Sequence, residues 1–309
     1  MSMVVIGTAF VDIKGFPEDT YLPTGRNAGS VEYIHGGVAR NVVEDIANVE
    51  LRPTYLGIVD DTPMGKGVLE KLRRHKVNTD YVSVRPDGMG LWLAIFDNNG
   101  DLAGSISKRP QADAILTMLQ QKGDEIFEQA ESAVLQVDLQ KDIIKKTIEL
   151  AEKHGTKLFG LVSNMSIAAE RRDFLQKFDC FICNQEEAGI LFLDDYMNKT
   201  PAEMESIIAD RVVRAKIPSM VVTLGAAGSV YADCEGRHGI CPARKVQVKD
   251  TTGAGDAFCA GVSIGLTYGK DLPGAVEIGT VLAASVITSS ENVCPRFEPT
   301  EFGLTVPQM

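Results

Sequence analysis

Residues 132–162 constrain the fold of this chain more than any other stretch. Two short apolar runs, at 132–137 and 157–162, flank a segment at 140–154 in which Ile and Leu alternate with Lys and Glu at helical spacing. A strand, a helix and a strand at this spacing are typical of a parallel sheet. The sequence therefore predicts an α/β protein with a mostly parallel central sheet.

Other segments extend this sheet and add a smaller one. Similar apolar runs predict further buried strands, at 3–6, 54–59, 180–183 and 220–224. Helical spacing or small residues predict helices, at 42–49, 67–75 and 275–288. A hairpin at 90–107, together with residues 14–34, predicts a small sheet that projects from the main domain. Within that region, 14–30 is expected to be a loop because it is rich in Gly, Pro and Asn.

Charge and composition exclude several classes of function. The chain has 309 residues, a net charge of -11 and no basic run, which argues against binding to nucleic acid. No apolar run approaches the ~18 residues of a membrane span, and the N-terminus lacks a signal-peptide pattern, so a cytoplasmic protein is expected. Cys180 and Cys183 lie in a buried-strand pattern that points them to opposite faces, so we interpret them as core residues and not as a metal or redox pair.

Residues 249–258, Lys-Asp-Thr-Thr-Gly-Ala-Gly-Asp-Ala-Phe, predict a turn that binds an anion. Two glycines one residue apart allow a sharp turn with uncovered N–H groups. A helix that starts there adds unpaired N–H groups and a positive dipole end, which together can hold a phosphate. Asp256, at the start of this helix, is either its N-terminal cap or a general base facing the ligand.

The run Asp-Thr-Thr-Gly-Ala-Gly-Asp-Ala-Phe at 250–258 resembles the C-terminal signature of the PfkB sugar and nucleoside kinases, the ribokinase-like family. The resemblance implies a three-layer α/β/α fold whose acceptor site is covered by a small β-sheet lid. The segments expected in each part are 14–35 and 85–109 for the lid, and 1–13, 36–84 and 110–309 for the α/β domain.

The resemblance also implies a reaction, the transfer of the γ-phosphoryl group of ATP to a primary hydroxyl of a sugar or nucleoside. Gly253, Ala254 and Gly255 would stabilise charge on the phosphoryl group as an anion hole, and Asp256 would accept the proton of the hydroxyl. Because phosphoryl transfer needs charge neutralisation, Mg²⁺ is expected together with ATP.

Two further segments are similar to the acceptor-binding parts of the family. Asp12 follows the first predicted strand, where the resemblance implies a contact with acceptor hydroxyls; on the residues alone it reads as a turn residue. The sequence Gly36-Gly37-Val-Ala-Arg-Asn41 matches the motif G-G-x-x-x-N, in which the glycines admit the acceptor and Asn41 would bind it. Together with Lys14-Gly15-x-Pro17, it looks most similar to the pseudouridine-kinase branch.

Asn184-x-x-Glu187 matches the N-x-x-E motif of the family. By resemblance, Asn184 and Glu187 would organise Mg²⁺ and its waters around the ATP phosphates, and one Glu suffices because magnesium keeps several waters. The same two residues are also an ordinary helix start, with an Asn cap and an acid in the first turn.

The remaining nucleotide candidates come from two segments near the C-terminal half. Thr223-Leu-Gly225-x-x-Gly228 resembles the strand and turn that lie along ATP in the family. Asn292 lies in a segment where relatives contact adenine and a monovalent cation. Asp250 is a candidate ligand for such a cation, which would be K⁺.

The chain departs from the family pattern in two places. Asp60 and Thr62 stand where relatives carry a Gly and an Asp, and residues 160–164 lack the acid that many relatives carry there. Arg109 is interpreted as a solvated side chain, with a phosphate contact as the alternative.

The acceptor and the assembly stay open at this stage. Pseudouridine, another nucleoside and a simple sugar are all candidates, and the lid is expected to serve as a homodimer contact. The alternative from another class is a ligand sensor that keeps the fold and has lost the chemistry. The intact Asp256 and the turn at 253–255 argue against that sensor.

Overall fold

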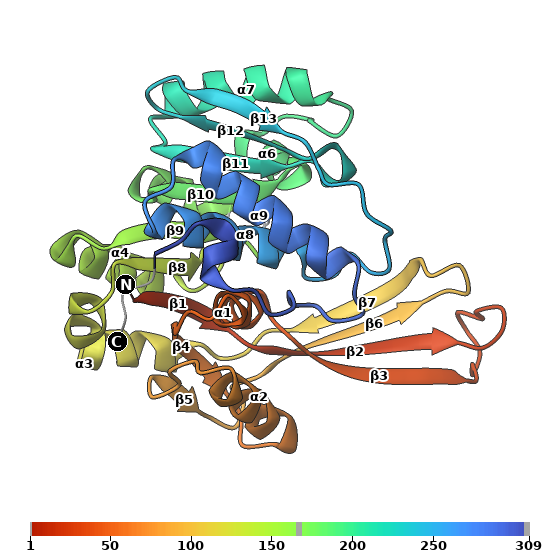
Figure 1. Cartoon of the computed structure of the whole chain (residues 1–309). Coiled ribbons are helices and arrows are strands. Elements are labelled where there is room, and N and C mark those ends of the chain that lie inside the picture. Colours follow the sequence, from red (N-terminus) through yellow and green to blue (C-terminus); the bar gives the residue numbers. More distant parts are fainter. Residues whose placement is uncertain (1, 165–168, 306–309) are drawn as a thin grey trace.

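The computed structural model describes residues 2–164 and 169–305, which form a layered α/β domain with a small sheet beside it (Figure 1). Within these residues, nine strands make up the central sheet. Across the sheet they follow the order β13 (His238–Cys241), β12 (Ser229–Asp233), β11 (Ser219–Thr223), β10 (Cys180–Asn184), β9 (Lys157–Leu161), β8 (Ser132–Gln136), β1 (Met3–Thr8), β4 (Thr54–Val59) and β5 (Val82–Val84). Strands β11 through β5 pair in parallel, and β12 and β13 add an antiparallel edge, which confirms the predicted sheet.

Helices cover both faces of this sheet. The helices on one face are α3 (Asp113–Glu128), α4 (Lys141–His154), α6 (Gln185–Phe192) and α7 (Pro201–Ala215), next to the 3-10 turn η1 (Ala169–Lys177). The helices on the other face are α1 (Val38–Asn48), α2 (Pro63–Arg74), α8 (Ala254–Thr267) and α9 (Leu272–Ile287). Two further 3-10 turns are η2 (Gly225–Ala227) and η3 (Pro299–Phe302).

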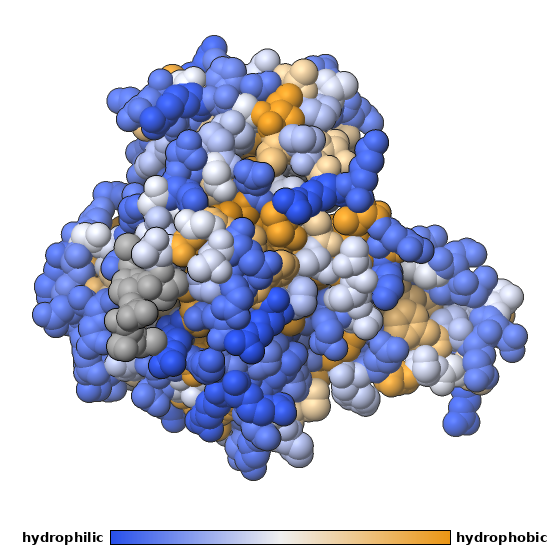
Figure 2. Space-filling view, in the orientation of Figure 1, coloured by the Kyte–Doolittle hydropathy of each residue, from blue (hydrophilic) through white to orange (hydrophobic). Residues whose placement is uncertain are grey.

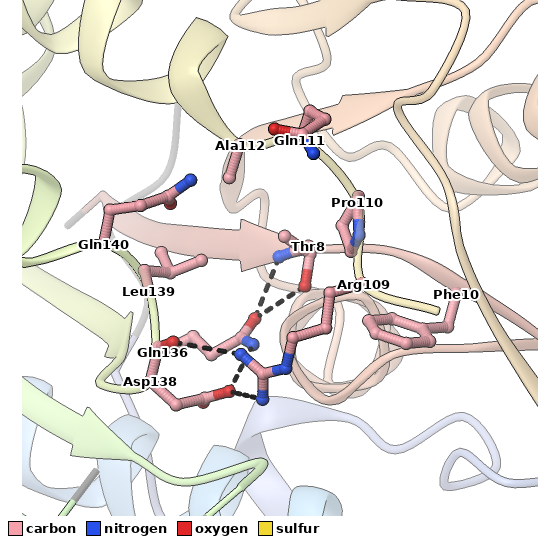
Figure 3. A pocket seen from close by; sticks show the side chains of 10 residues that line it. All are labelled: Thr8, Phe10, Arg109, Pro110, Gln111, Ala112, Gln136, Asp138, Leu139 and Gln140. Carbon is pink, nitrogen blue, oxygen red and sulfur yellow. Dashed lines mark hydrogen bonds and ion pairs between the residues drawn. The ribbon is translucent and has the colours of Figure 1, made fainter. Parts of the chain in front are cut away.

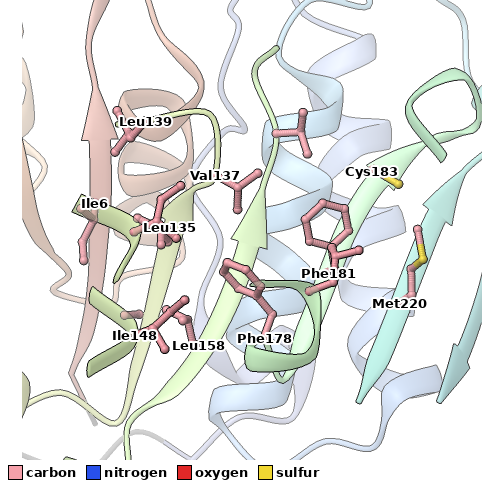
Figure 4. Close-up of a cluster of buried hydrophobic side chains, with 14 of the residues drawn as sticks. Ile6, Leu135, Val137, Leu139, Ile148, Leu158, Phe178, Phe181, Cys183 and Met220 are labelled. Atoms are coloured by element: carbon pink, nitrogen blue, oxygen red, sulfur yellow. The ribbon is translucent and has the colours of Figure 1, made fainter. Parts of the chain in front are cut away.

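The core consists of two apolar layers separated by the sheet. On β9, Leu158 packs in one layer with Leu135 and Phe181 (Figure 4). Its neighbour Phe159 points the other way and packs in the second layer with Val134. Both faces of the parallel strands are therefore buried, which explains why these strands read as continuous apolar runs in the sequence.

The two cysteines of β10 follow the same alternation. Cys180 lies in one apolar layer and Cys183 in the other, and both thiols are buried and free. This confirms their interpretation as core residues.

Helix α2 begins at Pro63, earlier than the predicted start at residue 67. The hydroxyl of Thr62 accepts a hydrogen bond from the N–H of Gly65, and Pro63 occupies the first helical position, which favours a helix start. Asp60 in turn accepts a hydrogen bond from the Thr62 hydroxyl at 2.5 Å. The segment that departs from the family pattern is thus a local helix cap.

The small sheet, called the lid here, has four strands among the described residues. Their order is β3 (Gly29–Gly36), β2 (Phe10–Pro17), β6 (Gly90–Phe96) and β7 (Leu102–Lys108). The predicted hairpin is confirmed, but the predicted loop over 14–30 is wrong for residues 14–17 and for Gly29 and Ser30. Gly15 pairs with strands on both sides, and Pro17 ends its strand, where a missing N–H is tolerated. The lid sheet starts at Phe10, so the expected boundary at residue 14 falls inside β2.

One face of the lid is apolar and exposed. Tyr33, Ile13, Leu93 and Ile106 form a row across the four strands, and Ile106 is 71% exposed. Figure 2 shows apolar residues reaching the surface of the lid.

Across the residues that the structure describes, no helix combines the length and the apolar character needed to cross a membrane.

Candidate active site

Three polar side chains lie where the parallel strands end, and two of them, Asn184 and Thr223, were predicted as site residues. Asn184 and Thr223 stand opposite each other at the ends of β10 and β11. Asp138 follows the end of β8 by two residues. The carboxyl ends of parallel strands are where open α/β sheets bind their ligands, so these side chains outline a binding edge.

Helices α1 and α8 begin in this region, and their first turns meet. Each follows a glycine with positive φ, 94° at Gly37 and 82° at Gly253, and neither helix has a side-chain cap. The side-chain amide of Asn41 donates a hydrogen bond to Asp256 Oδ2 at 2.6 Å. Asp256 therefore does not cap α8. The positive ends of two helices meet beside its carboxylate, an arrangement that can bind an anion next to a base.

The two glycines of the turn have different roles. A Cβ on Gly253 would come within 2.0 Å of the carbonyl oxygen of Asn292, so this position must be glycine for the protein to pack. A Cβ on Gly255 would meet nothing within 4 Å. Nothing in the described structure requires glycine at 255, and the open space above it leaves room for a ligand to approach the backbone.

Asp256 is a carboxylate whose proton affinity is unusually high. Burial raises its pKa to about 7, against the lowering effects of the Asn41 hydrogen bond and the Arg40 charge. A general base works best when its pKa lies near the operating pH. The environment of Asp256 thus suits proton transfer near neutrality.

Asp12 enters the site from the lid. It lies on the same face of β2 as Phe10 and Lys14, since alternate residues of a strand share a face. Burial raises the pKa of Asp12 to about 6, although Arg40 and Lys14 act in the opposite direction. A Cβ on Gly36 would come within 2.4 Å of the Asp12 carboxylate, so Gly36 makes room for it.

Arg40 is a site residue that the sequence did not reveal. It is 1% exposed, and its guanidinium donates to Glu44 at 2.6 Å, to the Gly36 carbonyl at 3.3 Å and to Asn292 Oδ1 at 3.3 Å. The Asn292 amide donates in turn to the carbonyl of His35 at 2.8 Å. The side chain of Asn292 therefore bonds on both sides and braces the two glycine turns, and the nucleotide contact expected of this residue stays a prediction.

The nucleotide candidates on β10 and β11 are placed side by side. Asn184 and Glu187 form a capping box at the start of α6, in which Asn184 Oδ1 accepts the Glu187 N–H and Glu187 Oε2 accepts the Asn184 N–H, both at 2.8 Å. The helix-start interpretation is thus confirmed, and the second oxygen of Glu187 stays free for a ligand. Burial raises the pKa of Glu187 to about 7.

Gly225 and Gly228 shape the turn that follows β11. Both have positive φ, 57° and 98°. A Cβ on Gly228 would come within 2.2 Å of the Cys241 carbonyl, whereas one on Gly225 would meet nothing within 4 Å. Gly228 is therefore required by packing, and Gly225 faces open space next to Thr223.

Asp250 does not stand alone as a cation ligand. Its Oδ1 accepts the N–H of Thr252 at 2.8 Å, and its Oδ2 lies 3.6 Å from Nζ of Lys14 on the lid. The ammonium group also lies 3.4 Å from the hydroxyl of Thr252. The described residues thus place a positive charge where the sequence led us to expect K⁺.

A cavity of about 290 Å³ opens between the end of β1, the end of β8 and residues 109–112 (Figure 3). Arg109 lines it, and its side chain is 38% exposed and donates to Asp138 Oδ2 at 2.7 Å, so it is a partly solvated side chain that pairs with an acid. Gln136, also in the wall, accepts hydrogen bonds from the N–H and hydroxyl of Thr8. The side chains of Gln111 and Gln140 line the cavity with amides that remain available to a ligand.

Comparisons with known proteins show what the whole chain is similar to. Residues 1–295 match the pfkB family carbohydrate kinase. A guanosine-inosine kinase of Exiguobacterium acetylicum is 34% identical over 292 residues, which cover 94% of this chain and 95% of that protein. A pseudouridine kinase of Escherichia coli (strain K12) is 22% identical, over 84% of this chain and 82% of that protein.

A solved structure gives the same picture of the fold. The ribokinase of Arabidopsis thaliana, complexed with ribose and ATP, matches with a TM-score of 0.82 and 20% identity, covering 97% of each chain. The ribokinase-like fold expected from the motifs is thereby confirmed.

Proposed function

Because this chain belongs to the pfkB family of carbohydrate kinases and is a phosphotransferase, we propose that it transfers the γ-phosphoryl group of ATP to a primary hydroxyl of a nucleoside. The observation that carries the proposal is the contact of Asn41 with Asp256 at the meeting point of two uncapped helix starts. A base and a site for phosphoryl charge stand together there.

Each step of the transfer has a group to perform it. Asp256 accepts the proton of the acceptor hydroxyl, whose oxygen forms a bond to the γ-phosphorus while the bond to the bridging oxygen of ADP breaks. The N–H of Gly255 would stabilise charge on the transferring group, because it lies in the first turn of α8, where helix N–H groups lack intrahelical partners, and faces open space; the N–H of Ala254 already bonds to the Thr251 carbonyl at 3.2 Å. Asp12 and Asn41 hold the acceptor, and the buried Oδ1 of Asn41 has no hydrogen-bond partner among the described residues.

The proposed nucleotide lies along Asn184, Thr223, Gly225 and Gly228. Mg²⁺ fits this arrangement, since Glu187 keeps one carboxylate oxygen free beside the strand end and a hard cation prefers oxygen ligands and water. When bound, Mg²⁺ would neutralise phosphate charge. Glu187 would hold it through water.

The cavity lined by Phe10, which lies two residues before Asp12 on β2, supports a nucleoside over a simple sugar. Its wall combines the ring of Phe10 with the amides of Gln111 and Gln140, which offer both donors and acceptors. Neither Asp12 nor Asn41 lines this cavity, so its volume of about 290 Å³ is additional to the space in which those two residues would hold a pentose. A flat heteroaromatic base with polar edges is the complement of such a wall. The similarity to a guanosine-inosine kinase makes guanosine and inosine the first acceptors to test, ahead of pseudouridine.

The test measures ADP release from Mg-ATP with guanosine, inosine, adenosine, pseudouridine, ribose and fructose. Turnover on a nucleoside, lost in Asp256→Asn, supports the proposal. Turnover on a sugar alone contradicts the nucleoside assignment but keeps the kinase. Binding of ATP without turnover on any acceptor favours the sensor.

A matched pair of variants tests the role of the cavity. Gln111→Leu and Gln140→Leu remove amides from its wall and should raise KM for the nucleoside by about tenfold each, as expected for one hydrogen bond. Gln129→Leu is the control, because Gln129 lies at the end of α3 and is no part of the cavity. Equal effects of all three would exclude a specific role for the cavity.

We further propose that the exposed face of the lid binds a second copy of the chain. Tyr33, Leu93 and Ile106 are 63%, 40% and 71% exposed in one row, and burying such a row against its own copy would remove apolar surface from water. A dimer in analytical ultracentrifugation that becomes a monomer in Ile106→Asp supports this. A monomeric parent protein would exclude it.

A further inference from the structure

Lys14 is a buried lysine whose position the reaction proposed above does not explain. Its side chain is 7% exposed, and its backbone lies in the middle of β2, paired with strands on both sides. Burying an ammonium group is costly unless it meets negative charge. Its neighbours at the charged end are the carboxylate of Asp250 at 3.6 Å and the hydroxyl of Thr252 at 3.4 Å.

These two contacts do not use the full capacity of the ammonium group. An ammonium has three donors, and both distances exceed those of ordinary N–H···O hydrogen bonds. Lys14 therefore retains the ability to donate to a further oxygen. Since Thr252 directly precedes the turn at 253–255, the nearest oxygen of a bound substrate would belong to the phosphoryl group.

The charge of the site calls for a cation at this point. Asp12, Asp256 and Glu187 surround the proposed reaction centre, and each shows a raised pKa because of burial. The buried Arg40 is already paired with Glu44 at 2.6 Å. ATP would bring more negative charge than one Mg²⁺ offsets, so a further cation next to the turn would stabilise the bound nucleotide.

A monovalent metal ion does not fit beside Asp250 while Lys14 stands there. Any ion bound at Oδ2 of Asp250 would lie within a few ångströms of a second positive charge, and the two would repel each other. The expectation of K⁺ at Asp250 therefore disagrees with the described structure.

We propose that Lys14 is a built-in cation, which takes the place of a monovalent ion at Asp250 and, carried on the lid, brings positive charge to the phosphoryl group at residues 253–255. The inference rests on the proposed phosphoryl transfer. It gives the lid a part in the chemistry in addition to covering the acceptor. Lys14 is a catalytic residue in this scheme, because its ammonium group donates to the transferring phosphoryl group, and it also balances the charge of the loop 250–252.

The first experiment compares Lys14→Met, Lys14→Arg and the parent protein in a buffer whose only added monovalent cation is tetramethylammonium. The parent should turn over equally with and without KCl at constant ionic strength. Lys14→Met, which keeps an unbranched side chain but removes the terminal ammonium, should lose about 10²-fold in kcat with a smaller change in KM for ATP, as for removal of one charge-stabilising donor. Lys14→Arg should stay within about tenfold of the parent, because it keeps the charge.

Chemical rescue tests the substitution of one cation for another. Lys14→Ala leaves a space at the position of the ammonium group. K⁺, NH₄⁺ or ethylammonium should raise the kcat of this variant at least tenfold and leave the kcat of the parent unchanged. Lys108→Met is the matched control, since Lys108 is another lid lysine but pairs with Asp87 at the surface. Its turnover and cation response should equal those of the parent.

Melting temperatures give a readout that does not depend on turnover. K⁺ should raise the melting temperature of Lys14→Ala more than that of the parent, since a ligand of the folded state stabilises it. This distinguishes the two proposals: absence of turnover on every acceptor contradicts the kinase assignment, while the K⁺ response still tests Lys14.

Three outcomes would overturn the role of Lys14. One is a parent protein that needs K⁺ for turnover. Another is a folded Lys14→Met variant with kcat within twofold of the parent, or an equal loss in Lys14→Met and Lys14→Arg. The third is a Lys14→Ala variant that no small cation rescues and K⁺ does not stabilise. The emission of Trp92, the only tryptophan of the chain and a lid residue, shows whether the lid of each variant is folded.

Discussion

The central sheet is buried on both faces, whereas the lid leaves one face open to solvent. Phe159 on β9 is 0% exposed, but Ile106 on β7 is 71% exposed. Both sheets carry apolar side chains at regular intervals, so composition does not separate them. The difference is in their cover: two helix layers enclose the central sheet, and no helix of the described residues lies over the outer face of the lid.

Because of this difference, the central sheet contributes mainly to stability and the lid mainly to function. The central sheet holds the molecule together, because apolar burial is the dominant favourable term in folding. The lid contributes Asp12 and Lys14 to the site. Nζ of Lys14 lies 3.4 Å from the hydroxyl of Thr252 and 3.6 Å from Oδ2 of Asp250, both just before the turn at 253–255. Contacts of this length are weaker than ordinary hydrogen bonds, and closure of a lid over a substrate is a common way to exclude water from a reaction. Changes in the two regions should therefore affect different measurements.

The largest effect is expected from Asp256→Asn, on the α/β domain. Removal of a general base typically costs about 10²- to 10⁴-fold in rate, and we expect kcat to fall by that amount. An activity within tenfold of the parent would contradict the role of Asp256.

The same variant should be more stable than the parent at pH 8. The pKa of Asp256 is 3.8 when unfolded and about 7 when folded, so the folded state binds more protons between these values and stability falls as pH rises through them. Asparagine does not ionise, so the variant does not lose this stability as pH rises. We expect a gain of roughly 1 kcal/mol at pH 8, discounted for partial exposure, and none at pH 4, measured by urea unfolding.

The largest effect on stability, and the sharpest contrast, is expected from a pair of core and lid variants. Phe159→Ala empties a fully buried site and should lower the free energy of unfolding by about 3–5 kcal/mol. Leu93→Ala removes a side chain that is 40% exposed on the lid and should change it by less than about 1 kcal/mol in the monomer. Equal losses would show that the lid face is buried in the folded protein in solution.

The same contrast explains how much the sequence could predict. The central strands were predicted because burial on both faces leaves continuous apolar runs, as at 180–183. Strand β2 was missed over residues 14–17 because Gly15 and Pro17 are local signals for a loop, and only pairing with two distant strands overrides them. Pairing between strands that are far apart in the chain cannot be detected in a short window of sequence.

The site shows the same limit. Gly253, Gly255 and Asp256 could be predicted because one continuous motif contains them. Lys14 and Arg40 could not, since their partners Asp250 and Asn292 are more than 200 positions away in the chain. Asp138 carried a weak signal that was passed over, an acid just after a predicted strand.

A moderate effect is expected from Asp12→Asn, on the lid. Asp12 would hold acceptor hydroxyls without taking part in bond making, so its loss should raise KM for the acceptor by about 10- to 100-fold and change kcat less. Initial rates over a range of acceptor concentrations separate the two constants. A loss confined to kcat would assign Asp12 to the chemical step.

The smallest and most specific effect concerns pH. The pKa of Asp256 is about 7, so kcat/KM for the acceptor should fall as pH decreases through 7, because the base becomes protonated. The Asn41 hydrogen bond lowers this pKa and the Asp12 charge raises it. Asn41→Leu should therefore move the midpoint of the profile to higher pH and Asp12→Asn to lower pH. Opposite shifts would show that the α/β domain and the lid act on one base from two sides, whereas shifts of the same sign would exclude Asp256 as the titrating group.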